Sequence, residues 1–413
     1  MRTIMHIDVN SAYLSWEAVD RLQHGATLDL RTVPSVVGGD EASRHGIVLA
    51  KSGPAKKFNI QTAETLHSAR QKCPNLLVVP PRYEVYMRCS KAMREILCDF
   101  SDAIQIFSVD ECFLDYTGME NRLGPPIDAA DRIRKRMRDE LGFTVNVGIS
   151  TNKLLAKMAG ELRKPDQTLT LYPRELQSKL WPLPIEELYM VGRRTAPKLR
   201  EMGIHTIGEL AQSDPAVLRY RLKSFGLMLY HFAHGIESSE VQPVGPSIKG
   251  LGNSTTTAFD VEDSYHAHLV LLSLSESVGS RLRANGLCAK QISISIRDRE
   301  LRNQSVQTTL YTPTDCTDHI YEAVRDLFQK LWEGQPLRHM GIRTTQLSPA
   351  EGQQLSLFDS SSTRLQALDS TIDRLRQRYG KRAICRGSFL NSGVKPVTGG
   401  VGEDEYQMMN SLL

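Results

Sequence analysis

The chain has 413 residues, a length that exceeds one ordinary hydrophobic core and predicts roughly two to four domains. Its composition, 40% hydrophobic and 24% charged with a net charge of +4, is that of a globular protein and permits a nucleic-acid partner without requiring one. Seven cysteines without a paired C-x-x-C spacing argue against a zinc site or a disulfide framework, and the lack of a signal-peptide pattern or a ~20-residue apolar run predicts a cytoplasmic protein without membrane contact.

The chain opens with a predicted buried strand that ends in an acid. Residues 3–7, TIMHI, run directly into Asp8. A helix is predicted next, over residues 12–22. By pattern alone, Tyr13 would be a core aromatic residue of that helix.

A second acidic pattern lies at residues 104–115, IQIFSVDECFLD, which predict two short strands with Asp110 and Glu111 at or near their junction. Adjacent carboxylates beside a packed sheet raise each other's pKa unless a positive charge neutralises them, and carboxylate oxygens suit Mg²⁺ or Mn²⁺. A solvated turn is the alternative for this stretch alone. Asp8, at the end of another strand, favours a two-metal site of the kind that carries out phosphoryl transfer.

Helices and strands alternate between these acids and residue 166. A helix is predicted around residues 84–98, and apolar residues recur at helical spacing from 127 to 141. A strand follows at 143–149. This alternation predicts an α+β domain.

The pattern changes after residue 167, where the chain reads as short helices up to about residue 240. Thr206 and Glu209 form a capping box that opens one of these helices. Proline and glycine at residues 243–246 predict a linker.

The last part of the chain predicts a second α+β domain over residues 248–347, in the order strand-helix-strand-strand-helix-strand. Its clearest strand lies at 291–297. A further helix with basic residues after it is predicted over 365–379, either packed on the protein or touching DNA, and residues after about 390 are predicted to be disordered.

Four motifs stand in order along the chain: DVNSAY at residues 8–13, SVDECFLD at 108–115, VGISTNK at 147–153 and RKP at 163–165. Together they resemble the Y-family DNA polymerases of the DNA polymerase IV kind, and the resemblance extends to about residue 390. It implies a multidomain α+β right-hand polymerase that performs translesion synthesis at low fidelity. The domains it implies are a palm (1–30 and 77–166), small fingers (31–76), a helical thumb (167–242), a little finger (243–348) and a tail (349–413).

The resemblance assigns roles to the acids and to a set of nucleotide contacts. Asp8, Asp110, Glu111 and the backbone carbonyl of Val9 are expected to hold two Mg²⁺, for which Mn²⁺ can substitute. Tyr13 is expected to be the steric gate that excludes a 2′-hydroxyl. The expected triphosphate contacts are Ser52, Lys56 and Lys164, although Gly53 and Lys56 stand where most relatives carry tyrosine and arginine.

The resemblance also implies contacts with DNA and with a protein partner. Residues 191–209 resemble a helix-hairpin-helix, in which Met190 replaces the first glycine of the common Gly-x-Gly form. The expected DNA contacts are Gly192, Arg193 and Arg194 in the thumb and Lys249, Arg297 and Arg299 in the little finger. Gln354, Leu355, Leu357 and Phe358 fit the pentapeptide that binds the bacterial sliding clamp.

The expected partners are therefore primer-template DNA, dNTP and the sliding clamp, for a monomer located at the nucleoid. Two alternatives remain open: a catalytically inactive, clamp-bound DNA-binding accessory protein, and a palm-fold nucleotidyl cyclase. Residues 38–41, GGDE, spell most of the diguanylate cyclase motif. However, Ala42 stands where that motif has phenylalanine, and the tetrapeptide precedes a predicted strand, so a solvated turn is the favoured interpretation.

Overall fold

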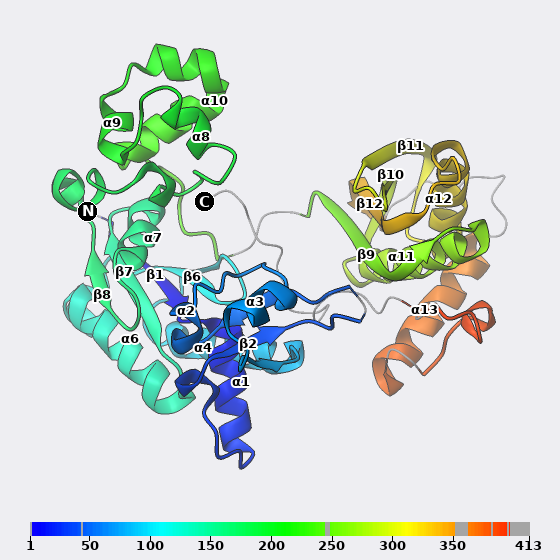
Figure 1. The fold of residues 1–413 in the computed structure, drawn as a ribbon, viewed down its shortest axis with the longest axis horizontal. Coiled ribbons are helices and arrows are strands. Elements are labelled where there is room, and N and C mark those ends of the chain that lie inside the picture. Colours follow the sequence, from blue (N-terminus) through cyan, green and yellow to red (C-terminus); the bar gives the residue numbers. More distant parts are fainter. Residues whose placement is uncertain are drawn as a thin grey trace. The chain divides into compact units, whose positions relative to one another are not determined.

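The computed structural model describes residues 2–42, 44–243, 248–351, 362–380, 383–394 and 396. The chain forms two compact units, of which the first holds residues 2–38 and 48–243 and the second holds residues 39–47 and the described residues from 248 on (Figure 1). Among the described residues, no helix is both long enough and apolar enough to cross a membrane.

A five-stranded sheet lies at the centre of the first unit, in the order β5-β6-β1-β7-β8. Its strands are β1 (Ile4–Val9), β5 (Ile104–Ile106), β6 (Glu111–Asp115), β7 (Val145–Ser150) and β8 (Thr168–Thr170). β1 is antiparallel to both β6 and β7, and all six of its residues are buried. The strands that carry the predicted acids Asp8 and Glu111 are thus neighbours in one sheet.

Helices cover both faces of this sheet. α1 (Ala12–Gln23), α4 (Tyr83–Cys98) and α6 (Pro126–Leu141) pack on the face that carries Met5 and Ile7, in one apolar core. α7 (Lys153–Glu161) packs on the opposite face, against β7 and β1. β8 extends the palm sheet beyond residue 166, so the expected boundary there is a few residues short.

A small three-stranded sheet, in the order β3-β2-β4, lies in the region predicted to be the fingers. Its elements are β2 (Ser35–Gly38), β3 (Val48–Lys51), β4 (Leu77–Val79), α2 (Gly53–Lys56), α3 (Leu66–Lys72) and the preceding 3-10 turn η1 (Leu30–Thr32). The GGDE tetrapeptide lies at the end of β2 and in the connection to β3, where Asp40 and Glu41 are exposed, as predicted for a turn. β4 belongs to this sheet, so the fingers reach residue 79 rather than 76.

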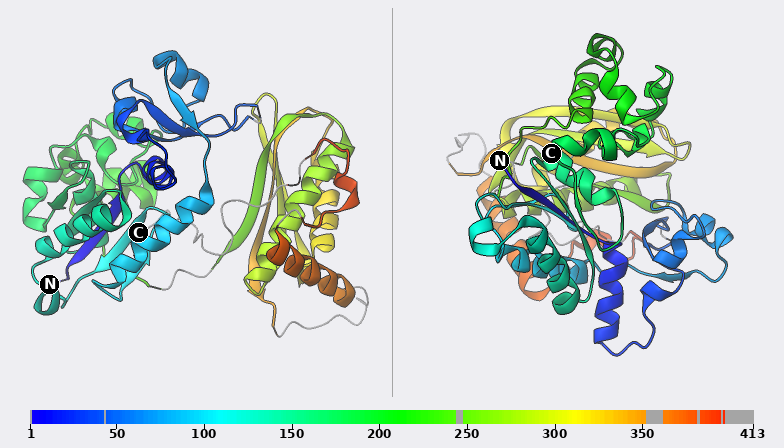
Figure 2. Two further views of the ribbon diagram at one scale, coloured as in Figure 1. Left: turned by 90° about the horizontal axis from the view of Figure 1, so that it is seen from below. Right: turned by 90° about the vertical axis from the view of Figure 1, so that its left-hand side faces the viewer.

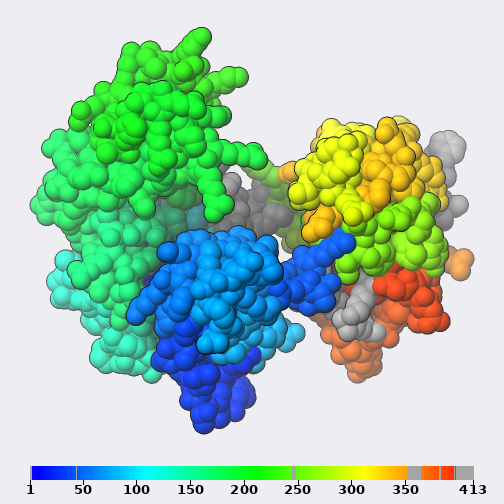
Figure 3. Space-filling view, in the orientation of Figure 1, coloured from blue at the N-terminus to red at the C-terminus, as the bar shows by residue number. Residues whose placement is uncertain are grey.

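The segment after β8 is helical, with an apolar core of its own. It comprises η2 (Pro173–Glu175), η3 (Leu176–Leu180), η4 (Ile185–Glu187), α8 (Ala196–Arg200), α9 (Ile207–Gln212) and α10 (Pro215–Ala233), and α5 (Glu120–Leu123) is a further short helix of this unit. The predicted capping box of Thr206 and Glu209 is confirmed at the start of α9. The space-filling view shows α8–α10 as a separate green lobe (Figure 3).

The second unit is a four-stranded antiparallel sheet in the order β11-β10-β12-β9, with helices on one face (Figure 2). In chain order its elements are β9 (Gly250–Val261), α11 (Ser264–Ala284), β10 (Leu287–Asp298), β11 (Asn303–Thr314), α12 (Thr317–Leu331) and β12 (Leu337–Pro349). This order confirms the predicted alternation of strands and helices.

The helix predicted over residues 365–379 is confirmed, and it takes the first of its two predicted positions, packed on the protein. α13 (Ser362–Tyr379) contacts α11, and Phe389 of η5 (Gly387–Phe389) is buried in the core of the unit. Val394 is buried there as well, so the described residues of this unit continue a few positions past residue 390.

Candidate active site

The register of the central sheet brings two of the three acids together. Asp8 on β1 pairs with Glu111 on β6, and the backbone N–H of Val9 donates to the carbonyl oxygen of Asp110 at 3.1 Å. Alternation along β1 turns Ile4, His6 and Asp8 away from the core that holds Met5 and Ile7, toward α7. The acids therefore lie at adjacent strand ends on one face of the sheet.

Two lysines pair with these carboxylates, and a histidine lies beside one of them. Lys164 Nζ lies 2.5 Å from Asp8 Oδ2, and the ammonium group of Lys157 on α7 donates to Glu111. His6 Nε2 lies 3.0 Å from Glu111 Oε2, and its ring is fully buried. Lys164, a predicted triphosphate contact, thus lies on Asp8, and His6 and Lys157 are not among the site residues predicted from sequence.

The carboxylates titrate differently because their neighbours differ. Burial raises the pKa of Asp8 to about 6, against the opposing charge of Lys164. Burial also raises the pKa of Asp110, whose carboxylate accepts a hydrogen bond from Ser108 Oγ at 2.6 Å. For Glu111, burial acts in the same direction, but His6 and Lys157 together outweigh it and lower the pKa to about 2.

The donor set fits a hard divalent cation, because it consists of carboxylate oxygens on neighbouring strands that already hold positively charged partners. As the side chains stand, no three His, Cys, Asp or Glu residues of the described ranges are gathered closely enough to bind a metal ion. Lys164 and Lys157 occupy one carboxylate oxygen each of Asp8 and Glu111.

The predicted nucleotide contacts have different surroundings. The ring of Tyr13 stacks on that of Tyr86, with centroids 4.6 Å apart and planes 12° apart. Lys56 is exposed in α2, as a triphosphate contact would need to be. Ser52 is buried, and its hydroxyl caps α2 by accepting from Ala55 N while donating to Val33 O, which gives it a structural role in the fingers.

The thumb residues predicted to contact DNA lie exposed in the turn before α8: Gly192, Arg193 and Arg194. Met190, which occupies the position of the missing glycine, has a φ of 74°, in the left-handed region that favours glycine. This backbone conformation explains why glycine is common there and leaves the hairpin intact at an energetic cost.

Met190→Gly is expected to be more stable than Met190→Ala by about 1 kcal/mol, the reverse of the order in a helix, because only glycine adopts this φ without strain. Comparing these two variants removes the packing of the methionine side chain from the result. Urea unfolding of both variants measures the difference. An alanine variant at least as stable as the glycine variant would contradict the backbone explanation.

In the second unit, the sheet face opposite the helices is polar. Alternation turns Ile292, Ile294 and Ile296 into the core, so Arg297 lies on the other face, where its Nε donates to Asn303 Oδ1 at 2.7 Å. The central rows of this face carry hydroxyl, amide, glycine and basic residues: Gln291, Ser293, Ser295, Ser305, Gln307, Gly341, Arg343, Thr345, Gly252 and Ser254. Lys249 and Arg299, the other predicted DNA contacts of this unit, are exposed. The predicted clamp-binding residues Gln354, Leu355, Leu357 and Phe358 lie outside the described residues.

Comparisons with known proteins agree with this architecture. Family models match residues 7–161 (impB/mucB/samB family), 173–204 (the helix-hairpin-helix motif of the same family) and 248–357 (its C-terminal domain). The chain is 45% identical to DNA polymerase IV of Clostridium acetobutylicum over 95% of this chain and 100% of the relative. The chain belongs to the Y-family DNA polymerases.

Two further similarities support this membership. DNA polymerase IV of Moorella thermoacetica is 38% identical over 95% of this chain and 97% of the relative. A Y-family DNA polymerase chimera of Dbh and Dpo4 has the same fold, with a TM-score of 0.71, 23% identity and coverage of 83% of this chain and 98% of that chain. This Y-family chain is accordingly a DNA-directed DNA polymerase with palm, fingers, thumb and little finger, rather than a cyclase or an inactive accessory protein.

Proposed function

We propose that the polymerase extends a primer by two-metal nucleotidyl transfer at Asp8, Asp110 and Glu111. The observation that carries this proposal is the pairing of Asp8 with Glu111 across β1 and β6, beside Asp110. Two Mg²⁺ or Mn²⁺ ions bound to these carboxylates and to the Val9 carbonyl would supply the positive charge that the primer 3′-hydroxyl and the triphosphate require.

The residues of the chain then have distinct tasks. Asp8 and Glu111, which pair with Lys164 and Lys157, would hold the metal ions through their carboxylate oxygens. Lys164 would neutralise the triphosphate together with Lys56. Both supply a point charge, without the bidentate geometry of arginine.

Template and primer would be held by the remaining predicted contacts. Backbone N–H groups at Gly192, with Arg193 and Arg194, would bind phosphates from the thumb. The polar face around Arg297 in the second unit would lie against the duplex backbone, since no central position on it carries a carboxylate that would repel phosphate.

Small fingers leave the nascent base pair loosely enclosed, which supports low-fidelity translesion synthesis. Primer extension across a template abasic site tests this claim against an undamaged template. We expect insertion opposite the lesion, and stalling one nucleotide before it would contradict the translesion assignment.

The residues from Gln354 to Phe358 are proposed to bind the sliding clamp. The polymerase itself is proposed to be a monomer located at the nucleoid.

Tyr13→Ala is expected to reduce the preference for dNTP over rNTP by about a hundredfold, since the tyrosine ring would otherwise collide with a 2′-hydroxyl. Tyr86 already covers one face of that ring and fixes its position. Single-nucleotide insertion kinetics with dCTP and CTP opposite guanine measure the ratio. Tyr13→Phe is the control that keeps the ring, and an unchanged ratio in the alanine variant would show that Tyr13 is only a core residue.

A further inference from the structure

α13 separates its charges onto two faces. Asp369 Oδ2 lies 3.0 Å from Arg283 Nη1, and Asp373 Oδ2 lies 2.6 Å from Arg283 Nε. Arg376 Nη2 lies 3.1 Å from Glu276 Oε2. Because Arg283 and Glu276 belong to α11, these ion pairs fix one face of α13 to the helix side of the second unit (Figure 2).

The opposite face of α13 carries only positive charge. At about 100° per residue, Arg364 and Arg378 lie on the far side of the helix from Asp369 and Asp373, and Arg374 lies on the flank beside Arg378. All three arginines are exposed, and within the described residues none of them is paired with a carboxylate. Lys381 and Arg382, which follow in the sequence, lie outside the described residues.

This face also contains a surface hollow of about 550 Å³, lined by Thr371, Arg374, Leu375, Gln377, Arg378 and Tyr379. Arg378 lies over the ring of Tyr379, 5.3 Å from its centre, and Tyr379 is 63% exposed. Arg374 and Arg378 are four residues apart, so their like charges repel each other in the free chain. An anion bound between them would relieve this repulsion.

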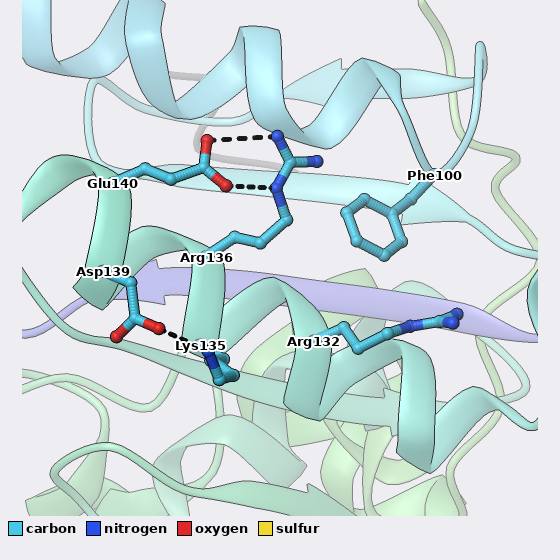
Figure 4. A pocket seen from close by; sticks show the side chains of 6 residues that line it. All are labelled: Phe100, Arg132, Lys135, Arg136, Asp139 and Glu140. Atoms are coloured by element: carbon cyan, nitrogen blue, oxygen red, sulfur yellow. Dashed lines mark hydrogen bonds and ion pairs between the residues drawn. The ribbon is translucent and has the colours of Figure 1, made fainter.

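A second surface hollow, on α6, is lined by basic residues and allows a comparison of their ion pairs with those of α13 (Figure 4). Its volume is about 320 Å³. There Arg136 lies 2.6 Å from Glu140 and also contacts Asp99, and Lys135 lies 2.6 Å from Asp139. Lys135 and Arg136 are thus paired with acids, whereas Arg132 in the same hollow donates to the Leu123 carbonyl oxygen and the arginines on the outer face of α13 have no carboxylate partner among the described residues.

We propose that the outer face of α13 binds the phosphate backbone of DNA. Unpaired guanidinium groups recognise phosphate through bidentate, charge-assisted hydrogen bonds. The fourteen-residue step from Arg364 to Arg378 spans about 21 Å along the helix, or about six base-pair steps of a duplex. This inference rests on the proposed DNA-binding function, because the polymerase reaction is what brings DNA to the chain, and it adds a contact on the helix side of the second unit.

The salt dependence of DNA binding by the full chain tests this proposal. Fluorescence anisotropy with a labelled primer-template gives the slope of log affinity against log salt concentration. Arg364→Ala/Arg374→Ala/Arg378→Ala is expected to reduce that slope by about 2 to 3 and to weaken binding about tenfold at low salt. The matched control, Lys135→Ala/Arg136→Ala/Arg138→Ala, removes the same net charge from ion-paired positions on α6. Its slope is expected to differ from that of wild type by less than about 0.5, which corresponds to about half a phosphate contact.

Substituting lysine for the same three arginines keeps the charge and is expected to restore most of the slope. An unchanged slope in the alanine variant, or an equal change in the α6 control, would overturn the proposal and leave an acidic protein as the occupant of this face. Primer extension by the wild-type chain is measured separately. Its failure would overturn the proposed function, whereas the slope comparison would still report on α13.

Discussion

Asp110→Asn is expected to slow nucleotide addition by about a thousandfold or more, because removing one carboxylate from a two-metal site forfeits roughly 4 kcal/mol of transition-state stabilisation. Asn keeps the shape of the side chain and can still accept the hydrogen bond from Ser108 Oγ. Single-turnover insertion of one dNTP measures the rate of the chemical step.

DNA binding is the control for this variant, since Asp110 lies in the palm and the proposed DNA contacts lie in the thumb and the second unit. The affinity for primer-template is expected to stay within about twofold of wild type, or ~0.4 kcal/mol. An Asp110→Asn enzyme with a wild-type insertion rate would show that this acid is a turn residue and that the site has been misassigned.

Gly148→Ala is expected to destabilise the first unit by about 3 kcal/mol or more, because overpacking against backbone cannot be relieved by side-chain rotation. Gly148 lies on β7 opposite His6, where α7 crosses the sheet. A Cβ at this position would lie against the Ala156 carbonyl oxygen and the Gly160 nitrogen, closer than non-bonded atoms can approach.

Gly53→Ala is the matched control, since a Cβ at Gly53 meets no atom within 4 Å. Urea unfolding should show a large loss of stability for the first variant and a change of less than about 1 kcal/mol for the second. A Gly148→Ala protein as stable as wild type would contradict the close approach of α7 to β7. Such a result would also question how Lys157, carried by α7, reaches Glu111.

The acids of the site could be predicted from sequence because each follows a β-prone run, and strand ends of one sheet lie close together. The lysines that pair with these acids in the structure could not be predicted in the same way. Lys157 comes from a helix that packs across the sheet, and the close approach of that helix depends on the missing Cβ of Gly148. His6 was available to sequence reasoning, since strand alternation places it on the same face as Asp8, two residues away.

In the rest of the chain, features that depend on local sequence could be predicted, and features that depend on contacts between distant residues could not. The short helices and the alternation of the second unit follow from local periodicity and capping, and they were predicted correctly. Ser52 stays a predicted nucleotide contact, and the two hydrogen bonds of its buried hydroxyl, to Val33 O and from Ala55 N, depend on a fold that its neighbours in sequence do not reveal. The packing of α13 depends on Arg283 and Glu276, which are distant in sequence, so its neutral inner face and basic outer face could not be separated in advance.

The most direct test of the metal site is the number of Mn²⁺ ions bound by the complex of polymerase, dideoxy-terminated primer-template and incoming dNTP, measured by electron paramagnetic resonance. We expect two bound ions per complex in wild type and fewer in Asp8→Asn, Asp110→Asn and Glu111→Gln. Equal numbers of bound ions in wild type and in all three variants would contradict the assignment of the metal site to these carboxylates.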